Sequence, residues 1–402
     1  MRRRRWVAGV AGLLMASIPL AGQDVPGRLL ISVRAGVDDA EAAQTLKRHG
    51  AVVRGHGRIA IAESSSAAVM ESLRATGMFE YVERDHYARL GTTPNDPSFA
   101  SQWHLARIAS PAAWDVTTGS SAVTVAVIDT GVDGTHSDLK ANVMPGWNFV
   151  AGTNDTKDRI GHGTAVAGTI AAAGNNGIGV AGVSWHSRIL PLVVVDENDV
   201  ATYSDIAEAI RYAADHGARV INISVGGPAQ SAALQSAVDY AWSQGSLIFA
   251  AMMNDGMATP YYPAACNHVM AVSATDAYDH LASFSNFGSW VTIAAPGYGI
   301  LTTAVGGGYA FCYGTSFASP IAAGVAALVW SVNAELTAAE VTMILEKSAD
   351  DLGAAKFDTS FGWGRVNAGK AVGLAAPADL PVVDAPATIV RNHVILHGQR
   401  PD

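Results

Sequence analysis

The sequence lacks the motifs that mark several large classes of enzyme and binding protein. It contains no HExxH segment, so a catalytic zinc ion is not expected. The glycine run Gly306 to Gly308 is surrounded neither by GxxxxGKS/T nor by a strand, GxGxxG and helix, and is interpreted as a hairpin turn rather than a phosphate loop. No internal repeat is present. The net charge of -9 argues against a nucleic-acid-binding surface.

Cysteine is scarce as well. The chain has 2 cysteines, Cys266 and Cys312. In an exported chain such a pair is a candidate disulfide, but the sequence does not give the distance between them, so a bridge and two buried thiols both remain open. Neither thiol is expected to act as a nucleophile, because no second base motif accompanies it.

Long apolar runs are confined to the N-terminus. Arg2 to Arg5 precede the apolar stretch Trp6 to Leu20, and the small residues Ala21 and Gly22 follow, as in a signal peptide over residues 1–22. An uncleaved anchor and a twin-arginine export route remain alternatives. We expect a secreted protein, extracellular or periplasmic, with no stable membrane insertion because no other run has membrane length.

Residues 28–92 are predicted to form a small α+β domain. The pattern gives a strand LLISVR, a helix that begins near Asp38 with Glu41 placed for a capping box, and Gly50 after its end. The strands AVVRGH and RIAIAE, a helix around SAAVMESLRAT and a strand FEYVER follow. This β-α-β-β-α-β order is ferredoxin-like.

Three later segments each carry a group with acid, base or nucleophile chemistry. VAVIDTGVDGTHSDL is predicted to be a buried strand with Asp129 at its end, because its apolar run has no period-2 alternation. GHGTAVAGTIAA starts a closely packed helix at His162, and GTSFASPIAAGVAALVW starts a helix that is apolar all round, and hence buried, at Ser316. Strand ends and helix starts converge in open α/β sheets.

These residue types fit nucleophilic catalysis. A serine hydroxyl needs a base within hydrogen-bond reach, and the base needs a carboxylate that holds its tautomer. Asn254, after the apolar strand SLIFAAMMNDG, supplies a donor for a developing oxyanion beside the Ser316 backbone N–H. Taken singly, the three residues could instead be a turn former, a packing residue and a helix N-cap.

The segments resemble the subtilisin-like serine proteases, whose pattern is DTG, GHGT and GTSxASP in this chain order. The resemblance covers about residues 95 to 372 and also includes NDPSFASQWHL, YSDIAEAIRYAADHGARVINISVGG and HLASFSNFGSWVTIAAPG. It implies that Asp129 orients the base, His162 is the general base and acid, Ser316 is the nucleophile and Asn254 is the oxyanion donor.

The resemblance also implies an architecture. We expect an α/β catalytic domain over residues 95–375, with a mostly parallel central sheet flanked by helices, and a linker or docked tail over residues 376–402. Residues 28–92 resemble the inhibitory pro-domain of the family, which assists folding, plugs the cleft with its C-terminal tail and is cut off by the enzyme itself, here near Arg89 to Pro94. A permanent α+β domain is the alternative. A monomer is expected.

The implied substrates are proteins or peptides, held through their backbone. Ser224, Val225 and Gly226 resemble the substrate-pairing segment, although SVGG could also be a strand that ends in a turn, and the opposing edge would be 199–201. Relatives have glycine where this chain has Met253. We hypothesise that Met253, with Tyr261 near the pocket floor, restricts the residue before the cut bond to modest size; alternatively, Met252 and Met253 pack in the core.

Two further departures flank the nucleophile: Phe317 stands where methionine is frequent, and Tyr313 where a small or amide residue is usual. Structural calcium is the ion that the resemblance implies. Asp138 and Gln102 resemble ligands of one such site, with carbonyls of the loop AGNNGIGV completing an oxygen shell and Asn175 left open. Helix capping is the alternative for Asp138.

The predicted function is a secreted serine endopeptidase that works through an acyl-enzyme and is made as a self-processed zymogen. A catalytically weakened relative that serves as a binding or folding scaffold is the alternative, because of Met253 and Tyr313. A dinucleotide-binding α/β protein is a third class, and the missing glycine fingerprint argues against it.

Overall fold

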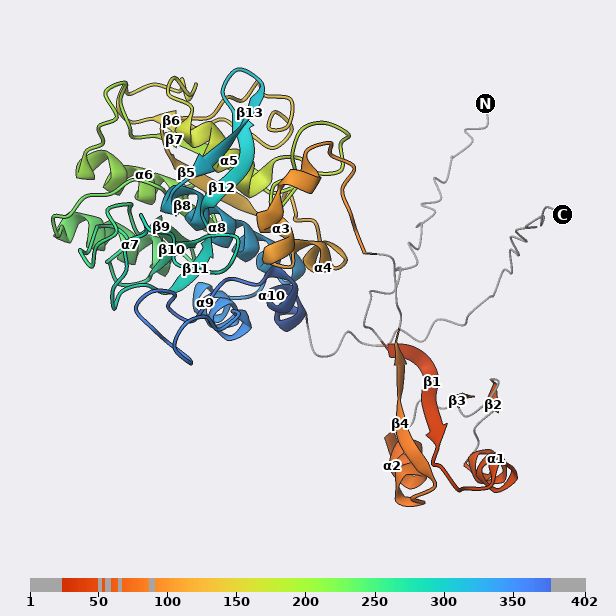
Figure 1. Ribbon diagram of the computed structural model, residues 1–402. Helices are drawn as coiled ribbons and strands as arrows, with labels where there is room; N and C mark the ends of the chain where they lie inside the picture. The colour runs from red at the N-terminus through yellow and green to blue at the C-terminus, as the bar shows by residue number, and fades with distance from the viewer. Residues whose placement is uncertain (1–23, 50–52, 55–58, 64–66, 87–90, 377–402) are drawn as a thin grey trace, which may run out of the picture.

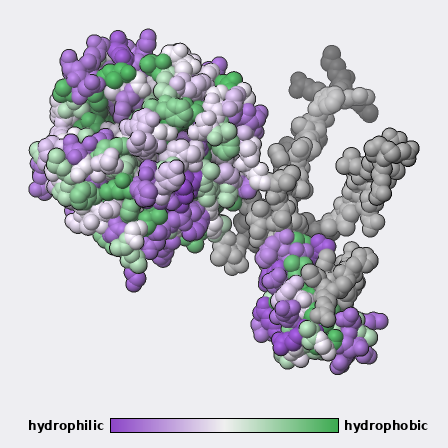
Figure 2. All heavy atoms as spheres, viewed as in Figure 1, coloured by the Kyte–Doolittle hydropathy of each residue, from purple (hydrophilic) through white to green (hydrophobic). Residues whose placement is uncertain are grey.

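The computed structural model describes residues 24–49, 53–54, 59–63, 67–86 and 91–376, which form two units (Figure 1). The predicted signal peptide, Gly50, Arg89 within the predicted cutting segment and residues 377–402 of the predicted tail lie outside the described residues. On the face in view, hydrophilic and hydrophobic residues are interspersed over the surface of the larger unit (Figure 2).

The smaller unit has the predicted order of elements. They are β1 (Asp24–Val33), α1 (Asp39–Arg48), β2 (Val53–Arg54), β3 (Ile59–Glu63), α2 (Ala67–Ala75) and β4 (Phe79–His86). The strands pair antiparallel in the order β2-β3-β1-β4. Asp38 caps α1, since its carboxylate accepts from the backbone N–H groups of Ala40 and Glu41 at 2.8 and 3.0 Å.

The larger unit is built on a seven-stranded sheet of order β11-β10-β9-β8-β5-β7-β6. Its strands are β5 (Thr124–Asp129), β6 (Trp147–Asn148), β7 (Arg188–Val193), β8 (Val220–Ile223), β9 (Leu247–Ala251), β10 (Val269–Thr275) and β11 (Ile293–Pro296). Every pairing in this sheet is parallel. The predicted α/β fold with a parallel central sheet is therefore confirmed.

Helices cover both faces of this sheet. They are α3 (Trp103–Arg107), α4 (Ser110–Trp114), α5 (His162–Ala171), α6 (Tyr203–Asp215), α7 (Ala232–Ser243), α8 (Thr315–Val332), α9 (Ala338–Ser348) and α10 (Ala368–Ala375), with a 3-10 turn at Phe99–Ser101. In Figure 1, α6 and α7 lie on one side of the sheet and α5 and α8 on the other.

Strand β5 shows how the two layers form. Its side chains alternate between the faces of the sheet, so Val125 and Val127 pack in the core with α5 and α8, while Ala126 and Ile128 pack in the core with α6 and α7. Both faces are apolar, which explains why the sequence of this strand shows no alternation. The strand is central and buried, as predicted.

Helix α8 is the innermost helix. It is the one helix in the described part of the chain that is long and apolar enough to cross a membrane by length and composition, with mean hydropathy 1.5, and 89% of that window is buried inside the protein. Its apolar surface is thus covered by the sheet and by neighbouring helices, as predicted for a core helix. Pro320 lies in its first turns.

A two-stranded hairpin stands outside the main sheet. Strands β12 (Tyr298–Ala304) and β13 (Gly308–Tyr313) pair antiparallel, and the glycine run Gly306 to Gly308 is at their turn, as predicted. The hairpin packs on α5 through Thr303, whose hydroxyl donates to the Thr164 carbonyl at 2.8 Å. Strand β13 leads directly into α8 and therefore positions the start of that helix.

Candidate active site

Asp129 and His162 meet at the carboxyl end of the sheet. Asp129 ends β5 and His162 begins α5, and His162 Nδ1 lies 2.8 Å from Asp129 Oδ1. The Asp129 side chain is 2% exposed, whereas that of His162 is 33% exposed. The buried carboxylate therefore fixes Nδ1 of the His162 ring, and the exposed part of the ring leaves Nε2 for the substrate side.

Glycines allow this approach. A Cβ at Gly163 would lie 2.1 Å from the Gly131 carbonyl oxygen and 3.1 Å from Asp129 Oδ1, so α5 can begin beside the end of β5 only without a side chain there. Gly131 has φ +112°, a conformation that favours glycine. The small residues of the GHGT segment thus have the packing role predicted for them.

The charge of Asp129 controls the protonation of His162. Its carboxylate, the largest influence on the ring, raises the pKa of His162 above the ordinary value of 6.5, against the opposing effect of burial. Asp158 and Asp199 add to the increase in the pKa. A base with a raised pKa accepts a proton more readily, as a serine nucleophile requires.

Asp158 is a positioning residue that the sequence analysis did not single out. Its buried carboxylate accepts from the Ile160 and Gly161 backbone N–H groups at 3.0 and 2.7 Å and from the Thr164 backbone and hydroxyl at 2.8 and 2.6 Å. It also accepts from the Thr130 hydroxyl at 2.9 Å. These bonds tie the start of α5 to the residue after Asp129. The spacing DxxGHGT was the available signal.

Ser316 is the second residue of α8 and is 8% exposed. The ring of the following residue, Phe317, lies 5.7 Å from the ring of His162, so the start of α8 is next to the start of α5. In the described part of the chain, no hydrogen bond joins the Ser316 hydroxyl to His162. Such bonds commonly tighten only when substrate is present.

Asn254 follows β9 and is oriented toward the same helix start. Its Oδ1 accepts from the Thr315 backbone N–H at 2.8 Å and from the Thr315 hydroxyl at 3.0 Å. The amide oxygen is thereby occupied, whereas the Nδ2 donor has no hydrogen-bond partner among the residues that the structure describes. Gly314 leaves room beside this donor, since a Cβ at Gly314 would lie 3.3 Å from Nδ2.

The residues predicted to bind substrate lie beside Ser316. The Ser224 hydroxyl donates to the Ser316 carbonyl at 3.1 Å, which joins the end of β8 to α8. A Cβ at Gly226 would lie 3.8 Å from Met253 Sδ, so the thioether lies against this segment. Met253 has φ +71° and is half-buried, whereas Met252 is fully buried in the core. The core-packing alternative therefore holds for Met252 alone.

The predicted opposite edge of the cleft is the segment 199–201, and Tyr261 is predicted to lie near the pocket floor. Asp199 has φ +61° and lies in a bend, and Ala201 forms an isolated antiparallel bridge with Val195, so the segment 199–201 closes the turn after β7. A hydrogen bond from Tyr261 to Asp255 raises the pKa of Tyr261 above 10.0. Two residues near Ser316 differ from the usual family pattern. Of these, Tyr313 is 55% exposed to solvent, whereas Phe317 is 5% exposed and therefore buried.

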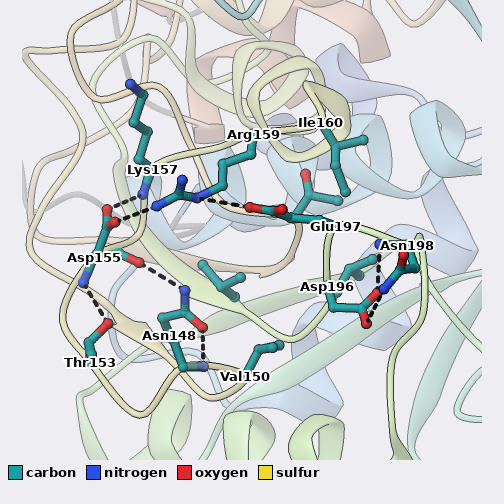
Figure 3. Close-up of a pocket in the computed structure, with 14 residues that line it drawn as sticks. Asn148, Val150, Thr153, Asp155, Lys157, Arg159, Ile160, Asp196, Glu197 and Asn198 are labelled. Atoms are coloured by element: carbon teal, nitrogen blue, oxygen red, sulfur yellow. Dashed lines mark hydrogen bonds and ion pairs between the residues drawn. The ribbon is translucent and has the colours of Figure 1, made fainter.

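A cavity of about 460 Å³ is lined by Thr130, which follows Asp129, and by Ile160, which lies two residues before His162. Figure 3 shows the side chains that line it. Charged side chains line it, and Arg159 pairs with Asp155 at 2.9 Å and with Glu197 at 3.7 Å. These ion pairs link the loop before His162 to the loop after β7. The cavity lies beside the candidate active site, and none of the predicted catalytic residues lines it.

Gln102 does not fit a calcium site. Its Oε1 accepts from the Ala181 N–H at 2.9 Å, and its Nε2 donates to the Ala181 and Leu301 carbonyls at 2.8 and 3.2 Å. The buried amide is thus fully used in joining three segments of backbone. This residue has a structural role at the position where the family resemblance implied a ligand.

Asp138 fits a cation better, together with Asp96. Asp138 is fully buried and accepts from Asn176 Nδ2, the Val180 N–H and the Tyr309 hydroxyl. Asp96 is 4% exposed and accepts from the Asn175 N–H. Burial raises the pKa of Asp96, and the charge of Asp138 raises it further. No described ion pair neutralises either carboxylate, and lone pairs remain on both.

Asp96 is not among the residues predicted from the sequence. Asp96 lies in the same segment, NDPSFASQWHL, from which the family resemblance implied Gln102 as a calcium ligand.

Both cysteines are free in the structure: Cys266 is buried and Cys312 half-buried, and burial raises the pKa of each thiol to about 11. The two-thiol alternative is therefore the one observed.

Comparisons with known proteins point to one family. A family model described as "Subtilase family" matches residues 120–364. The chain is similar to the thermophilic serine proteinase of Bacillus sp. (strain AK1), with 41% identity over 87% of this chain and 88% of that protein. It is similar to thermitase of Thermoactinomyces vulgaris, with 43% identity over 70% of this chain and 99% of that protein.

Solved structures show the same likeness. A protease structure from Pseudoalteromonas arctica PAMC 21717 has a TM-score of 0.67 and 34% identity and covers 71% of this chain and 100% of that one. The structure of a lanthipeptide protease has a TM-score of 0.64 and 29% identity and covers 70% of this chain and 99% of that one.

Proposed function

Since this chain belongs to the subtilase family and is a serine endopeptidase, we propose that Asp129, His162 and Ser316 are its catalytic residues and that it is a secreted, self-processed enzyme. The observation that carries the assignment is the 2.8 Å hydrogen bond between His162 and buried Asp129, at a helix start that contacts the helix start bearing Ser316.

In this proposal, His162 removes the proton from the Ser316 hydroxyl as its oxygen attacks the carbonyl carbon of the scissile bond. Asp129 holds the ring in the tautomer that accepts this proton and stabilises the charged ring. Asn254 Nδ2 and the Ser316 N–H donate to the oxyanion of the tetrahedral intermediate. His162 then gives the proton to the leaving amine, and water releases the acyl group by the same steps.

The peptide before the cut bond would lie between Ser224–Gly226 and the edge 199–201, paired through its main chain. Val225 and Gly226 follow β8 without a break, and the bond from Ser224 to the Ser316 carbonyl fixes their distance from the nucleophile. Backbone pairing accepts many sequences, which suits an endopeptidase of proteins and peptides.

Met253 would restrict the residue before the cut bond. Its thioether lies against Gly226, in the segment that would hold the substrate, which favours small side chains there. Profiling a peptide library tests this hypothesis. The Met253→Gly variant should accept large aromatic side chains at least about tenfold better than the wild type, because a pocket distinguishes such volumes by about 1–3 kcal/mol. A wild-type preference for large aromatic residues there would refute it.

The smaller unit would be the inhibitory pro-domain, cut near Arg89 to Pro94 by the enzyme itself. Its β-α-β-β-α-β order, its position before the enzyme unit and the signal-like N-terminus support this proposal. Export, extracellular or periplasmic, agrees with an enzyme that degrades proteins and needs an inhibitor until release. We propose a monomer.

Structural calcium would bind at Asp138 and Asp96 rather than at Gln102. The ion would supply the positive charge that two buried carboxylates lack, and the loop 174–180, whose N–H groups donate to both carboxylates, would provide carbonyl oxygens to complete an oxygen shell. It would act on stability and take no part in the reaction.

Labelling with a serine-directed fluorophosphonate tests the catalytic assignment. We expect the wild type to be labelled and Ser316→Ala to be unlabelled while it keeps the same melting temperature. A wild type that resists labelling would support the alternative, a weakened relative that acts as a binding or folding scaffold. Labelling that persists in Ser316→Ala would overturn Ser316 as the nucleophile.

A further inference from the structure

One asparagine of the chain is followed directly by a glycine. This pair, Asn176 and Gly177, lies in the loop between α5 and β7, and both residues are exposed to water. Such a pair is chemically labile, because the backbone nitrogen of the next residue can attack the asparagine amide, and a glycine has no side chain that hinders the attack. A Cβ at Gly177 would have no neighbour within 4 Å, so the surrounding loop does not cover this position either.

The structure holds both reacting groups of this pair. The Asn176 amide donates through Nδ2 to Asp138 Oδ1 at 2.9 Å, and its Oδ1 accepts from the Ile178 N–H at 2.9 Å. The nucleophile is held as well, since the Gly177 N–H donates to Asn95 Oδ1 at 2.8 Å. Before an attack, the Gly177 nitrogen must give up this hydrogen bond, and the leaving Nδ2 must give up Asp138.

Asn95 reaches Gly177 from another part of the chain, the segment before α3. This segment is fixed to the loop by two further bonds: the Asn95 N–H donates to Asn175 Oδ1 at 3.2 Å, and the Asn175 N–H donates to Asp96 Oδ2 at 2.6 Å. The Asn95 side chain is itself exposed, and its bond to Gly177 is the one hydrogen bond described for it. Truncation of this side chain would therefore release the Gly177 N–H and leave the other two bonds in place.

On these grounds we propose that Asn176 is a site of spontaneous deamidation and that Asn95 sets its rate by holding the Gly177 N–H. The Gly177 nitrogen attacks Cγ of Asn176 and forms a five-membered imide, while its proton passes through water to Nδ2, which leaves as ammonia. Water then adds to either carbonyl of the imide, one C–N bond breaks, and aspartate or isoaspartate remains. No oxidant or reductant takes part, and the inference goes beyond the proposed function because it does not need Ser316.

The product would change the surroundings of Asp138. The amide donor that now faces Asp138 Oδ1 would become a carboxylate, so a hydrogen bond would be lost and a like charge would lie beside a buried carboxylate. The isoaspartate form also adds one carbon atom to the backbone of the loop. In buffer without added cation, deamidation would therefore lower the melting temperature of the enzyme unit.

Peptide mass spectrometry measures the rate. The Ser316→Ala chain serves as the parent, so that self-digestion does not interfere with a long incubation in mildly alkaline buffer. The fraction of Asn176 in which O has replaced NH is followed with time. We expect Asn95→Ala in this chain to convert Asn176 about tenfold faster than the parent does, because the nitrogen has lost a hydrogen bond that restrained it.

Two further variants serve as controls. Asn95→Asp keeps an oxygen that accepts the Gly177 N–H and should retain the slow rate of the parent. Asn333→Ala removes another amide oxygen that accepts a backbone N–H, that of Glu335 at 3.1 Å, and should leave the rate at Asn176 unchanged. Asn175 gives an internal reference in the same peptide, since no glycine follows it, and it should convert more slowly than Asn176 in Asn95→Ala.

The outcomes decide the site and its control separately. Equal rates at Asn176 in the parent and in Asn95→Ala would overturn the role of Asn95, as would equal acceleration in Asn333→Ala. An Asn95→Ala chain in which Asn176 stays intact would overturn the site itself. The product mimic Asn176→Asp should melt below the parent in buffer without added cation, and an unchanged melting temperature would contradict the effect on Asp138. None of these results bears on Ser316 as the nucleophile.

Discussion

His162 links pH to stability and activity with opposite signs. Asp129 raises the pKa of His162 in the folded protein above 6.5. The stabilisation by the charged pair is therefore complete below the unfolded pKa of about 6.5 and is lost as the pH rises through the folded pKa. Catalysis requires the neutral ring, so activity appears over the pH range in which this stabilisation disappears.

The variant Asp129→Asn tests this coupling. We expect the acid limb of kcat/KM, which lies above pH 6.5 in the wild type, to move to lower pH because the charge that raises the pKa of His162 is gone. We expect kcat to fall by about 10⁴, as when the carboxylate of a comparable triad is replaced. A pH series of initial rates measures both effects. An acid limb that does not move would contradict His162 as the titrating base.

At the scale of elements, close contact between α5 and β5 brings the base to its carboxylate. The contact depends on glycine at the first turn of α5, where a side chain would overlap the backbone of the loop after β5. Asp158 then fixes the same turn through backbone and threonine donors. The precision of the pair therefore comes from how two elements pack, in addition to their residue types.

Substitution Gly163→Ala tests the packing of these elements. A methyl group 2.1 Å from the Gly131 carbonyl oxygen must displace α5, so we expect a loss of about 3 kcal/mol in the free energy of unfolding and little activity. Urea unfolding and fluorophosphonate labelling measure the two effects. Gly373→Ala in α10 is the matched control: nothing lies within 4 Å of its Cβ, and it should gain about 0.5–1 kcal/mol. Equal effects would contradict the packing argument.

At the scale of the whole molecule, a pair of buried carboxylates and the smaller unit would both affect the protein away from the reacting atoms. Buried Asp96 and Asp138 join the segment before α3 to the loop 174–180, and neither has a described cationic partner. The smaller unit precedes the enzyme unit in the chain, with the predicted cutting segment between them. Ion binding and chain cleavage would therefore both act on the protein as a whole.

Removal of calcium should lower the melting temperature. An ion at a thousand times its Kd contributes about 4 kcal/mol, and chelation would remove this and leave two buried carboxylates without a counter-ion. Differential scanning calorimetry with calcium and with chelator measures the difference. Asp96→Asn should reduce this difference in melting temperature, while Asp205→Asn, at a half-buried position in the first turn of α6, should leave the difference unchanged. A melting temperature insensitive to calcium in the wild type would contradict the site.

Self-processing should depend on Ser316. We expect the wild type to separate into a fragment with residues 28–92 and an enzyme fragment, and Ser316→Ala to keep both units in one chain, because the hydroxyl that attacks the linking segment is missing. Mass spectrometry of the purified proteins measures this. Addition of active wild type should cut the variant. Cleavage of Ser316→Ala produced without any active enzyme would contradict self-processing.

The sequence by itself determined which segments form strands and helices and which of them are buried. The apolar run of β5, the small residues around His162 and the apolar helix after Ser316 specify a strand end and two helix starts, because hydrophobic periodicity and glycine act within a few residues. The parallel α/β fold was predicted from these local patterns together with the resemblance to the subtilisin-like serine proteases. So did the expectation that the acid, base and nucleophile meet at one edge of the sheet.

Only the tertiary structure decided which side chains touch. Met253 packs against Gly226, whereas Met252 is buried in the core. The two thiols are unpaired, and the Gln102 amide bonds to backbone groups. Asp96 lies close enough to Asp138 for the charge of Asp138 to raise its pKa. These outcomes depend on distances between segments far apart in the chain. Hydrogen bonds and packing act over a few ångströms in space, and a linear pattern carries no record of that separation.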